Sequence, residues 1–472
     1  MSLFRKKEMR HIIALAEKTN SLRRDLGAFD LTLMGIGAIV GTGIFVLTGT
    51  GALVAGPALT ISFILGGIVC LLTALCYAEF ASTIPVSGSA YTYSFATLGE
   101  LVAWIIGWNL VLEYALVSAA VSVGWSGYFQ SFLLGFGVVL PIELTTAYGT
   151  HSGSVTWFNL PAFCIVMIVT WLLSIGIRES KRMNNIAVVL KIGIVLLFIV
   201  TGATHVTPAN WVPFTPFGWN GIMHGAAIIF FSYLGFDAVT CAAEEVKNPT
   251  RSMPIGIIAS LLVCVVLYVI VTLIMTGIVP YAKFAGVNHP VSLALQYAHL
   301  HWIAGFIDLG AILGMTTVIL VMTYAQTRIF YSMSRDGLLP AVFSKIDMHR
   351  KTPYISTWLI GSVIAVIGAT VPLNILAEMA NIGTLSAFSI IAFSIIVLRK
   401  TQPNLPRKFS CPGVPYIPML AILFCVYLML HLSTITWYCF LLWFCIGLFI
   451  YFAYSRHNSV LNNKREKISE NT

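Results

Sequence analysis

The chain carries near its start the apolar stretch Met34-Gly35-Ile36-Gly37-Ala38-Ile39-Val40-Gly41-Thr42-Gly43-Ile44-Phe45, in the middle of a hydrophobic segment at 29–54. This segment is long enough to cross a bilayer, whose hydrocarbon core needs about 20 helical residues. Its glycines make it a poor helix, because each costs about 1 kcal/mol relative to alanine in a helix interior. We therefore expect a helix break at Gly41 and Gly43. An unwound turn at membrane depth must be surrounded by protein or line a cavity, so the break predicts a binding site.

The composition excludes a water-soluble globular protein. Of the 472 residues, 58% are hydrophobic and only 10% are charged, whereas about 25% of the residues in soluble domains are charged. The chain is therefore predicted to be an all-α membrane protein with many spans. No small-residue cleavage site follows the first apolar run, so we interpret that run as a retained span and not as a signal peptide. The nine cysteines have no metal-like spacing, and we expect neither a metal site nor a disulfide framework.

Apolar length and periodicity predict 12 transmembrane helices, and the basic residues give an independent test of this number. With twelve spans and a cytoplasmic N-terminus, 25 of the 27 lysines and arginines fall in cytoplasmic segments, as expected from the positive-inside rule. Lys283 falls in an outer loop and Lys191 within the fifth span. We expect a multi-pass protein of the cell (plasma) membrane with both termini cytoplasmic, and a short interfacial helix at about 291–300 in an outer loop. The spans are predicted at 29–54, 58–83, 101–133, 158–177, 184–204, 219–243, 255–279, 303–331, 354–371, 376–398, 416–433 and 435–454.

A second span shows the same kind of interruption as the first. In the sixth span, the run Phe230-Phe231-Ser232-Tyr233-Leu234-Gly235-Phe236-Asp237 breaks the apolar pattern near mid-membrane. Interrupted helices at corresponding places in two halves point to a transporter site built from inverted repeats. The expected organisation is a cytoplasmic N-terminal segment (1–28), a first repeat (29–205), a second repeat (219–399), spans eleven and twelve (416–454) and a cytoplasmic tail (455–472).

The direction of each span indicates what its break can bind. The first span runs outward, so the half-helix that begins near Gly43 presents free amides and a positive dipole end, which suit a carboxylate. The sixth span runs inward, and its first half ends near Phe231 with free carbonyls that suit an ammonium group. One alternative is that Gly37-x-x-x-Gly41 is only a helix-packing motif, which the second break at Gly235 makes less favoured. A nucleotide-binding loop is disfavoured because no flanking βαβ pattern exists.

Four intramembrane charges have open roles. Lys191 lies about eight residues into the fifth span, where a desolvated lysine could gain and lose a proton. Its expected partners are the opened carbonyls around Gly37 to Gly41 and hydroxyls in span eight; the alternative is a lysine that extends to the cytoplasmic surface. Glu113, in the middle of the third span, marks either a substrate pathway or a pair with a neighbouring span. Asp237 is expected to cap the half-helix after the second break. Glu79, at the inner end of the second span, is expected to pair with a cytoplasmic basic side chain.

Several motifs together resemble a known family. They are Gly41-Thr42-Gly43-Ile44-Phe45, Tyr77-Ala78-Glu79-Phe80 followed by Pro85-Val86-Ser87-Gly88 and Tyr91, Gly235-Phe236-Asp237 leading to Glu244-Glu245-Val246-Lys247-Asn248-Pro249 and Pro254, and Arg328-x-x-Tyr331-Ser332-Met333-Ser334-Arg335-Asp336-Gly337-Leu338-Leu339-Pro340. In order and spacing they resemble permeases of the amino acid-polyamine-organocation superfamily, and in it a bacterial member of the cationic amino acid transporter branch.

This resemblance implies a 5+5 inverted-repeat (LeuT-like) core with discontinuous helices 1 and 6, alternating access, and roles for individual residues. The substrate carboxylate would bind the amides of Thr42, Gly43 and Ile44. Phe231 would close over the substrate, and Lys191 would couple transport to protons. In the side-chain pocket, Glu113 would attract a cationic substrate and Met322 would exclude a long one. The substrate ammonium would bind the carbonyls of Ile39, Val40, Phe231, Ser232 and Leu234.

The predicted function is secondary active transport, a proton-coupled symport of small neutral and/or cationic L-amino acids. The alternatives are an amino acid exchanger or uniporter without proton coupling, and a non-transporting amino acid sensor on the same scaffold. An enzyme is disfavoured because the spans contain no Ser/His, paired-Asp or His-Glu-x-x-His set. The expected partners are an L-amino acid, a proton and the lipid bilayer, with no cofactor and no nucleic acid. The sequence leaves open whether a small membrane protein also binds.

Overall fold

The computed structural model describes residues 5–6, 25–84, 89–147, 156–176, 181–347 and 352–462. The motif residues 85–88, most of the N-terminal segment 1–28 and the last ten residues of the tail lie outside these ranges, as do the side chains of 89, 181–184, 241 and 244. Within them the chain is helical apart from connections and one isolated bridge between Leu26 and Val246. The prediction of an all-α membrane protein is confirmed.

Eight helical stretches in the described residues are long and apolar enough to cross a membrane, and four further apolar helices are shorter. The four are Ala28–Ile39, Leu160–Ser174, Tyr354–Thr370 and Tyr416–Met429, and they fall within the predicted spans one, four, nine and eleven. The count of twelve spans therefore stays a prediction. The helices up to the middle of the chain are α2 (Ala28–Ile39), η1 (Gly43–Leu47), α3 (Thr48–Ala55), η2 (Gly56–Ala58), α4 (Leu59–Thr83), α5 (Ser89–Thr97), α6 (Glu100–Leu134), η3 (Ile142–Leu144), α7 (Leu160–Ser174), α8 (Lys181–Ala203) and η4 (Pro208–Trp211).

The second half of the chain repeats this alternation of long helices and short turns. Its elements are α9 (Gly218–Ile229), η5 (Phe230–Tyr233), η6 (Phe236–Glu245), α10 (Pro249–Ile278), η7 (Tyr281–Phe284), α11 (Pro290–Tyr297), α12 (His301–Arg335), η8 (Ala341–Ser344), α13 (Tyr354–Thr370), α14 (Leu373–Thr401), α15 (Tyr416–Met429), α16 (Thr434–Ile450), η9 (Tyr451–Ser455) and α17 (Arg456–Asn458). The short helix expected at 291–300 is present as α11.

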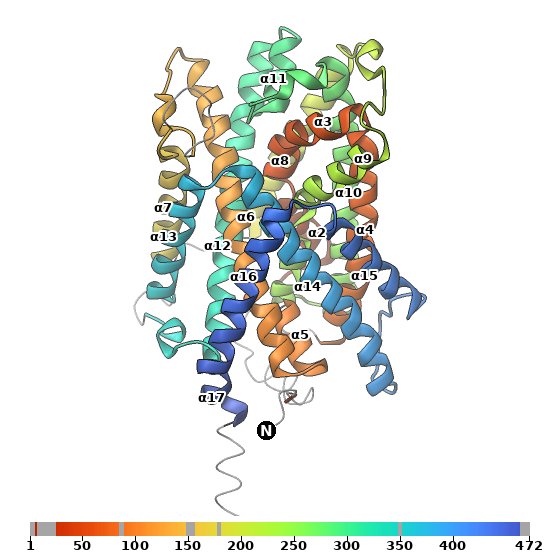
Figure 1. Cartoon of the computed structure of the whole chain (residues 1–472), viewed down its shortest axis with the longest axis vertical. Helices are drawn as coiled ribbons and strands as arrows, with labels where there is room; N and C mark the ends of the chain where they lie inside the picture. The colour runs from red at the N-terminus through yellow and green to blue at the C-terminus, as the bar shows by residue number, and fades with distance from the viewer. Residues whose placement is uncertain are drawn as a thin grey trace, which may run out of the picture.

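The long helices form two groups that pack mainly within themselves. In one group α10 packs extensively on α4 and α2, and α9 packs on α3 and α4. In the other, α6 packs on α12, α14 and α13, and α13 packs on α7. Figure 1 shows α11 at one end of the bundle and α5 and α17 at the opposite end, which are the predicted outer and inner sides. We call the first group the α4 group and the second the α6 group.

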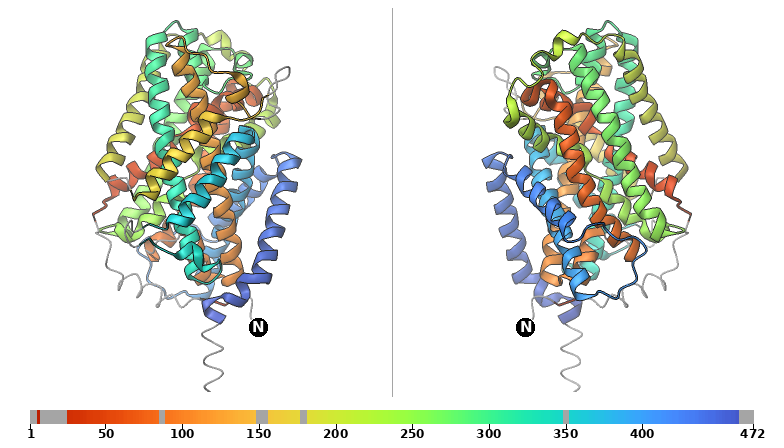
Figure 2. Two further views of the ribbon diagram at one scale, coloured as in Figure 1. Left: turned by 90° about the vertical axis from the view of Figure 1, so that its left-hand side faces the viewer. Right: turned by 90° about the vertical axis from the view of Figure 1, so that its right-hand side faces the viewer.

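Helix α16 is fastened to α6 by tryptophans and lies at the edge of the bundle (Figure 2). Trp108 Nε1 donates to Trp443 O (2.9 Å), Trp443 Nε1 donates to Trp108 O (3.3 Å), and their rings stack with centroids 4.3 Å apart. Trp104 Nε1 donates to Gly447 O (2.9 Å). A side chain at Gly447 would lie 2.4 Å from the Trp108 ring, so only glycine permits this approach.

The segment after α16 is docked on the inner ends of α6 and α12. The hydroxyl of Ser459 donates to the buried carboxylate of Glu100 (2.7 Å), at the start of α6. The hydroxyl of Ser455 donates to Leu338 O (2.6 Å), and the Val460 amide donates to Asp336 O (3.1 Å) in the turn after α12. The described part of the tail is thus joined to the α6 group by hydrogen bonds.

Candidate functional site

The first interruption lies where the glycines predict it. Helix α2 ends at Ile39, Val40 is extended (φ −75°, ψ 99°), and the next helical segment, η1, begins at Gly43. Val40 and Gly41 are buried although they are not part of a regular helix. Because η1 starts afresh here, its first amides have no acceptor one turn earlier and are free to bind another group.

The second interruption follows α9. Leu234 is extended (φ −62°, ψ 142°) and Gly235 is left-handed (φ +107°), so the chain turns before η6 begins at Phe236. A side chain at Gly235 would be strained by this φ. It would also lie 2.7 Å from Cε of Met322 and 3.1 Å from Ala38 O. Glycine is required at this position on both counts.

The two interruptions touch each other. A Cβ on Gly43 would lie 2.3 Å from the Cα of Ser232, so the amide end of η1 and the carbonyl end of η5 meet directly. Tyr268, on α10, lies beside both: its hydroxyl donates to Ile39 O (2.9 Å) and to Ser232 O (3.0 Å). A hydroxyl has one proton, so these two bonds share it.

Three of the five carbonyls that the resemblance assigns to an ammonium group lie at or beside this contact, those of Ile39, Phe231 and Ser232. Ile39 O and Ser232 O accept the Tyr268 hydroxyl, and Phe231 O accepts the Leu234 amide (3.2 Å). Each carbonyl oxygen has a second lone pair, so these bonds leave it able to accept another donor. The Phe231 side chain is buried in the same place.

Lys191, on α8, is buried and reaches the first interruption. Its Nζ donates to Gly37 O (2.8 Å), a carbonyl in the last turn of α2. A Cβ on Gly314 of α12 would lie 3.2 Å from the Cε of Lys191, so the side chain passes between α8, α2 and α12. The ammonium therefore points into the bundle and not towards the cytoplasmic surface.

Glu113, on α6, is buried, and neither of its carboxylate oxygens accepts a hydrogen bond from another described residue. Asp237 and the hydroxyl of Thr384 are its polar neighbours. Asp237 Oδ2 accepts the Tyr114 hydroxyl (3.0 Å). The N-cap residue of η6 is Gly235, so Asp237 lies in the first turn and not at the capping position, although its carboxylate still meets the backbone amides of Gly235, Asp237 and Ala238 there. Among the described residues, no basic side chain forms an ion pair with Glu113.

Helix α12 presents two apolar side chains to the interruptions. Cγ2 of Val318 lies 3.1 Å from the position of a Cβ on Gly41, and Met322, one turn later, lies against Gly235. Both side chains are buried. They give the two breaks an apolar boundary on the side of α12.

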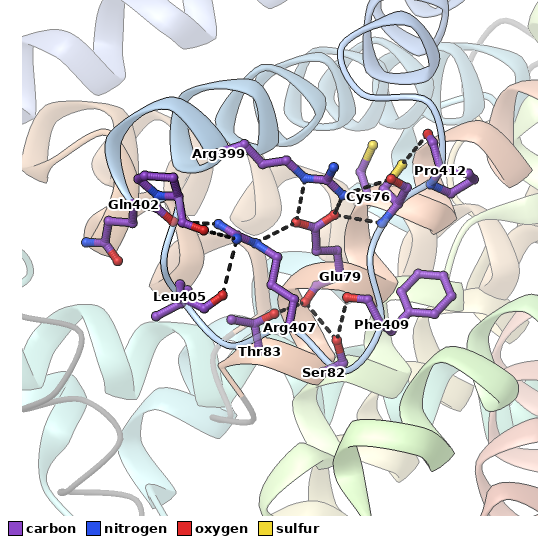
Figure 3. Close-up of polar contacts among 12 residues, drawn as sticks. Cys76, Glu79, Ser82, Thr83, Arg399, Gln402, Leu405, Arg407, Phe409 and Pro412 are labelled. Atoms are coloured by element: carbon purple, nitrogen blue, oxygen red, sulfur yellow. Dashed lines mark hydrogen bonds and ion pairs between the residues drawn. The ribbon is translucent and has the colours of Figure 1, made fainter.

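Glu79 lies at the inner end of α4 and forms the predicted pair with a basic side chain. Figure 3 shows its carboxylate between two arginines. Arg399 donates to it through Nε (3.1 Å) and Nη2 (2.7 Å), Arg407 lies 3.3 Å away, and the Cys411 amide donates to it (2.7 Å). The glutamate thereby fastens the loop between α14 and α15 to α4.

The comparison with known families adds an independent finding: a family model described as amino acid permease matches residues 26–450. The chain belongs to the amino acid permease family. It is therefore a transport protein of the amino acid-polyamine-organocation superfamily, and the resemblance drawn from its motifs is confirmed.

Three relatives of this permease are informative. The branched-chain amino acid permease BcaP of Bacillus subtilis is 61% identical over 98% of this chain and 99% of its own length. The methylthioribose transporter of the same organism is 52% identical over the same shares. The vacuolar cationic amino acid transporter 4 of Arabidopsis thaliana is 38% identical over 85% of this chain and 68% of its own length.

Sequence reasoning missed two residues that the permease places at important contacts. Tyr268 lies in an apolar helix, and nothing nearby in the sequence indicates that its hydroxyl meets two breaks far from it along the chain. Asp308, on α12, is buried beside α11 and α6. An acid at the sixth position of the predicted span 303–331 was a usable signal for Asp308; Tyr268 had none.

Proposed function

We propose that this permease imports L-amino acids together with protons by alternating access. The observation that carries the proposal is the contact between the two breaks, at Gly43 and Ser232. It brings free amides and free carbonyls to one place, which is what the two charged ends of an α-amino acid require. The substrate carboxylate would bind the amides of Thr42, Gly43 and Ile44, and the ammonium would bind the carbonyls around Tyr268.

The proposed carrier of the proton is Lys191. Its ammonium donates to Gly37 O on the first span and is shielded from solvent, and desolvation favours the neutral form of a lysine. Loss of its proton would weaken the hydrogen bond between α8 and α2, because a neutral amine is a weaker donor than an ammonium group. Replacing Lys191 by alanine should abolish accumulation driven by a proton gradient while binding is partly retained.

We propose small and branched apolar amino acids as substrates. Val318 and Met322 are buried against the two breaks and supply an apolar surface of limited size. A relative named as a branched-chain amino acid permease is 61% identical, which agrees with such a pocket. Glu113 would then carry a proton when the neighbouring side chain of the substrate is apolar, since an ion without a partner is costly at that depth.

The proposed topology is twelve spans with both termini in the cytoplasm of a cell membrane, and a core made of repeats 29–205 and 219–399. Two alternatives differ in what drives the protein: an exchanger or uniporter would transport without using a proton gradient, and a sensor would bind without accumulating substrate. One relative is named as a methylthioribose transporter. Methylthioribose is a sugar with neither a carboxylate nor an ammonium group, so it is a useful competitor to test against an amino acid.

Uptake into proteoliposomes tests these proposals together. Labelled leucine should accumulate in response to an imposed inward proton gradient and not a sodium gradient. Unlabelled leucine should compete, whereas leucine methyl ester, leucinamide and methylthioribose should compete poorly. Competition by the ester equal to that by leucine would overturn the carboxylate site, and uptake by the Lys191→Ala variant that still follows the proton gradient would overturn the coupling role.

A further inference from the structure

A polar cluster at the predicted outer side joins three helices. Asp308, on α12, is 2% exposed, and its Oδ2 accepts the hydroxyl of Ser131 on α6 (2.8 Å). The hydroxyl of Ser292 on α11 faces the same carboxylate. Gln296, one turn further along α11, lies 3.5 Å from Ser131 Oγ and 3.4 Å from Ser292 Oγ. We call α11 and the two residues before it, 288–297, the lid.

The lid also lies in very close contact with two glycines. A Cβ on Gly127 of α6 would lie 2.6 Å from the Cβ of Asn288. A Cβ on Gly49 of α3 would lie 2.9 Å from the Cβ of Pro290. The lid therefore bridges the α6 group on one side and the α4 group, through α3, on the other.

The lid is held by different interactions on its two sides. Towards α6 and α12 it is held by the hydrogen bonds around Asp308. Towards α3, no hydrogen bond joins the lid within the part of the chain that the structure describes, and the close contact at Gly49 is made by a proline, which has no amide to donate. Beneath the lid, the Tyr128 hydroxyl donates to Phe45 O (2.6 Å), so one hydrogen bond does cross between α6 and η1.

We propose that Asp308 is a positioning residue that keeps the lid on α6 and α12, so that the outer side opens at the contact between Gly49 and Pro290. The proposal rests on the proposed function, because only a transport cycle requires the outer side to open. During opening, η1 and α3 leave the lid, the Tyr128–Phe45 bond breaks, and the Asp308 cluster remains intact.

Two matched cysteine pairs test where the lid separates. The pair Gly127→Cys with Asn288→Cys joins the lid to α6, and the pair Gly49→Cys with Pro290→Cys joins it to α3. Each pair begins at a Cβ separation somewhat below the roughly 3.8 Å of a disulfide, so each requires a similar small shift. We expect the oxidised α6 pair to take up leucine within about twofold of its reduced form, and the oxidised α3 pair to lose at least about tenfold, recovered by a reductant.

The other outcomes of that experiment contradict the proposal. Loss of uptake in the α6 pair means that the lid also leaves α6, and unchanged uptake in the α3 pair means that the outer side opens elsewhere. The single-cysteine variants show the cost of each substitution alone. Absence of leucine uptake by the wild-type permease in the same vesicles would count against the proposed function and not against the position of the lid.

Substitutions at Asp308 test its role directly. Asp308→Asn keeps an acceptor oxygen for Ser131, whereas Asp308→Leu removes it. In the Gly127→Cys/Asn288→Cys background we expect Asp308→Leu to slow disulfide formation at least about fivefold and Asp308→Asn to restore the rate. Equal rates in the Asp308, Asp308→Asn and Asp308→Leu proteins would overturn the role of Asp308. An Asp308→Asn variant as slow as Asp308→Leu would contradict positioning by the hydrogen bond from Ser131, because the asparagine keeps that acceptor and lacks only the negative charge. If the Leu variant does not fold, Ser131→Ala removes the same bond from the other side and should slow the rate in the same direction.

Discussion

At the scale of single residues, Tyr268 is the side chain that connects the two breaks. Its hydroxyl meets carbonyls of both, and each such hydrogen bond contributes about 1 kcal/mol. Tyr268→Phe should therefore weaken leucine uptake by about fivefold to tenfold, mainly through a higher KM, because the breaks lose their common anchor.

Tyr233→Phe provides the matched control for this prediction. The Tyr233 hydroxyl donates to one backbone carbonyl, that of Phe63 (2.7 Å), and not to a carbonyl of either break. Its ring centroid lies 5.4 Å from that of Tyr268. This variant should lose comparable stability with a smaller effect on KM. Equal KM values for the two variants would contradict a special role of Tyr268.

Gly43 provides a second prediction at the same scale. A methyl group there would lie 2.3 Å from the backbone of Ser232, which cannot move aside as a flexible side chain could. Gly43→Ala should therefore abolish uptake in protein that still reaches the membrane. Gly193→Ala is the control: it adds a methyl group in α8 with no neighbouring atom within 4 Å, so it should preserve uptake and stabilise the helix by about 1 kcal/mol. Normal uptake in the Gly43→Ala variant would show that the breaks need not touch.

The sequence predicted the position of the breaks because glycine acts locally on helix stability, and Gly41, Gly43 and Gly235 all lie within or beside an interruption. It also predicted that Lys191 lies at membrane depth, because the depth of a residue follows from its position within a span. The prediction that Lys191 pairs with the opened carbonyls around Gly37 to Gly41 is confirmed by its hydrogen bond to Gly37 O. The contacts of Tyr268 and Asp308 could not be predicted, because they join residues far apart in the chain, although the position of Asp308 within a span was itself a signal. Asp237 is not the N-cap residue because η6 begins at Phe236, two residues earlier than a helix capped by Asp237 would.

At the scale of elements, the Glu79 cluster holds the loop between α14 and α15 against α4. Removing one partner of a buried ion pair costs about 3–5 kcal/mol, because the other charge is left without compensation. Glu79→Gln should therefore lower the melting temperature of the purified permease by several degrees, measured by fluorescence. Glu143→Gln, at an exposed position, should leave it unchanged. A Glu79→Gln protein as stable as the wild type would mean that the arginines find other acceptors.

At the scale of the whole molecule, the tail contributes to the α6 group through Ser455, Ser459 and Val460. A chain that ends at Tyr454 loses all three contacts and leaves the buried carboxylate of Glu100 with fewer donors. Its melting temperature should fall, whereas a chain that ends at Asn462 retains every one of these contacts and should melt like the full chain. Equal melting of the two truncated chains would show that the docked tail is not needed for stability.

The reciprocal tryptophan pair between α6 and α16 has a practical consequence. Because Trp108 and Trp443 each donate to the backbone of the other, α16 cannot shift along α6 without losing both bonds. A fluorophore attached just behind α16 would therefore report the position of α6 itself. It would serve as a fixed reference point from which to measure, by energy transfer, how far other parts of the permease travel.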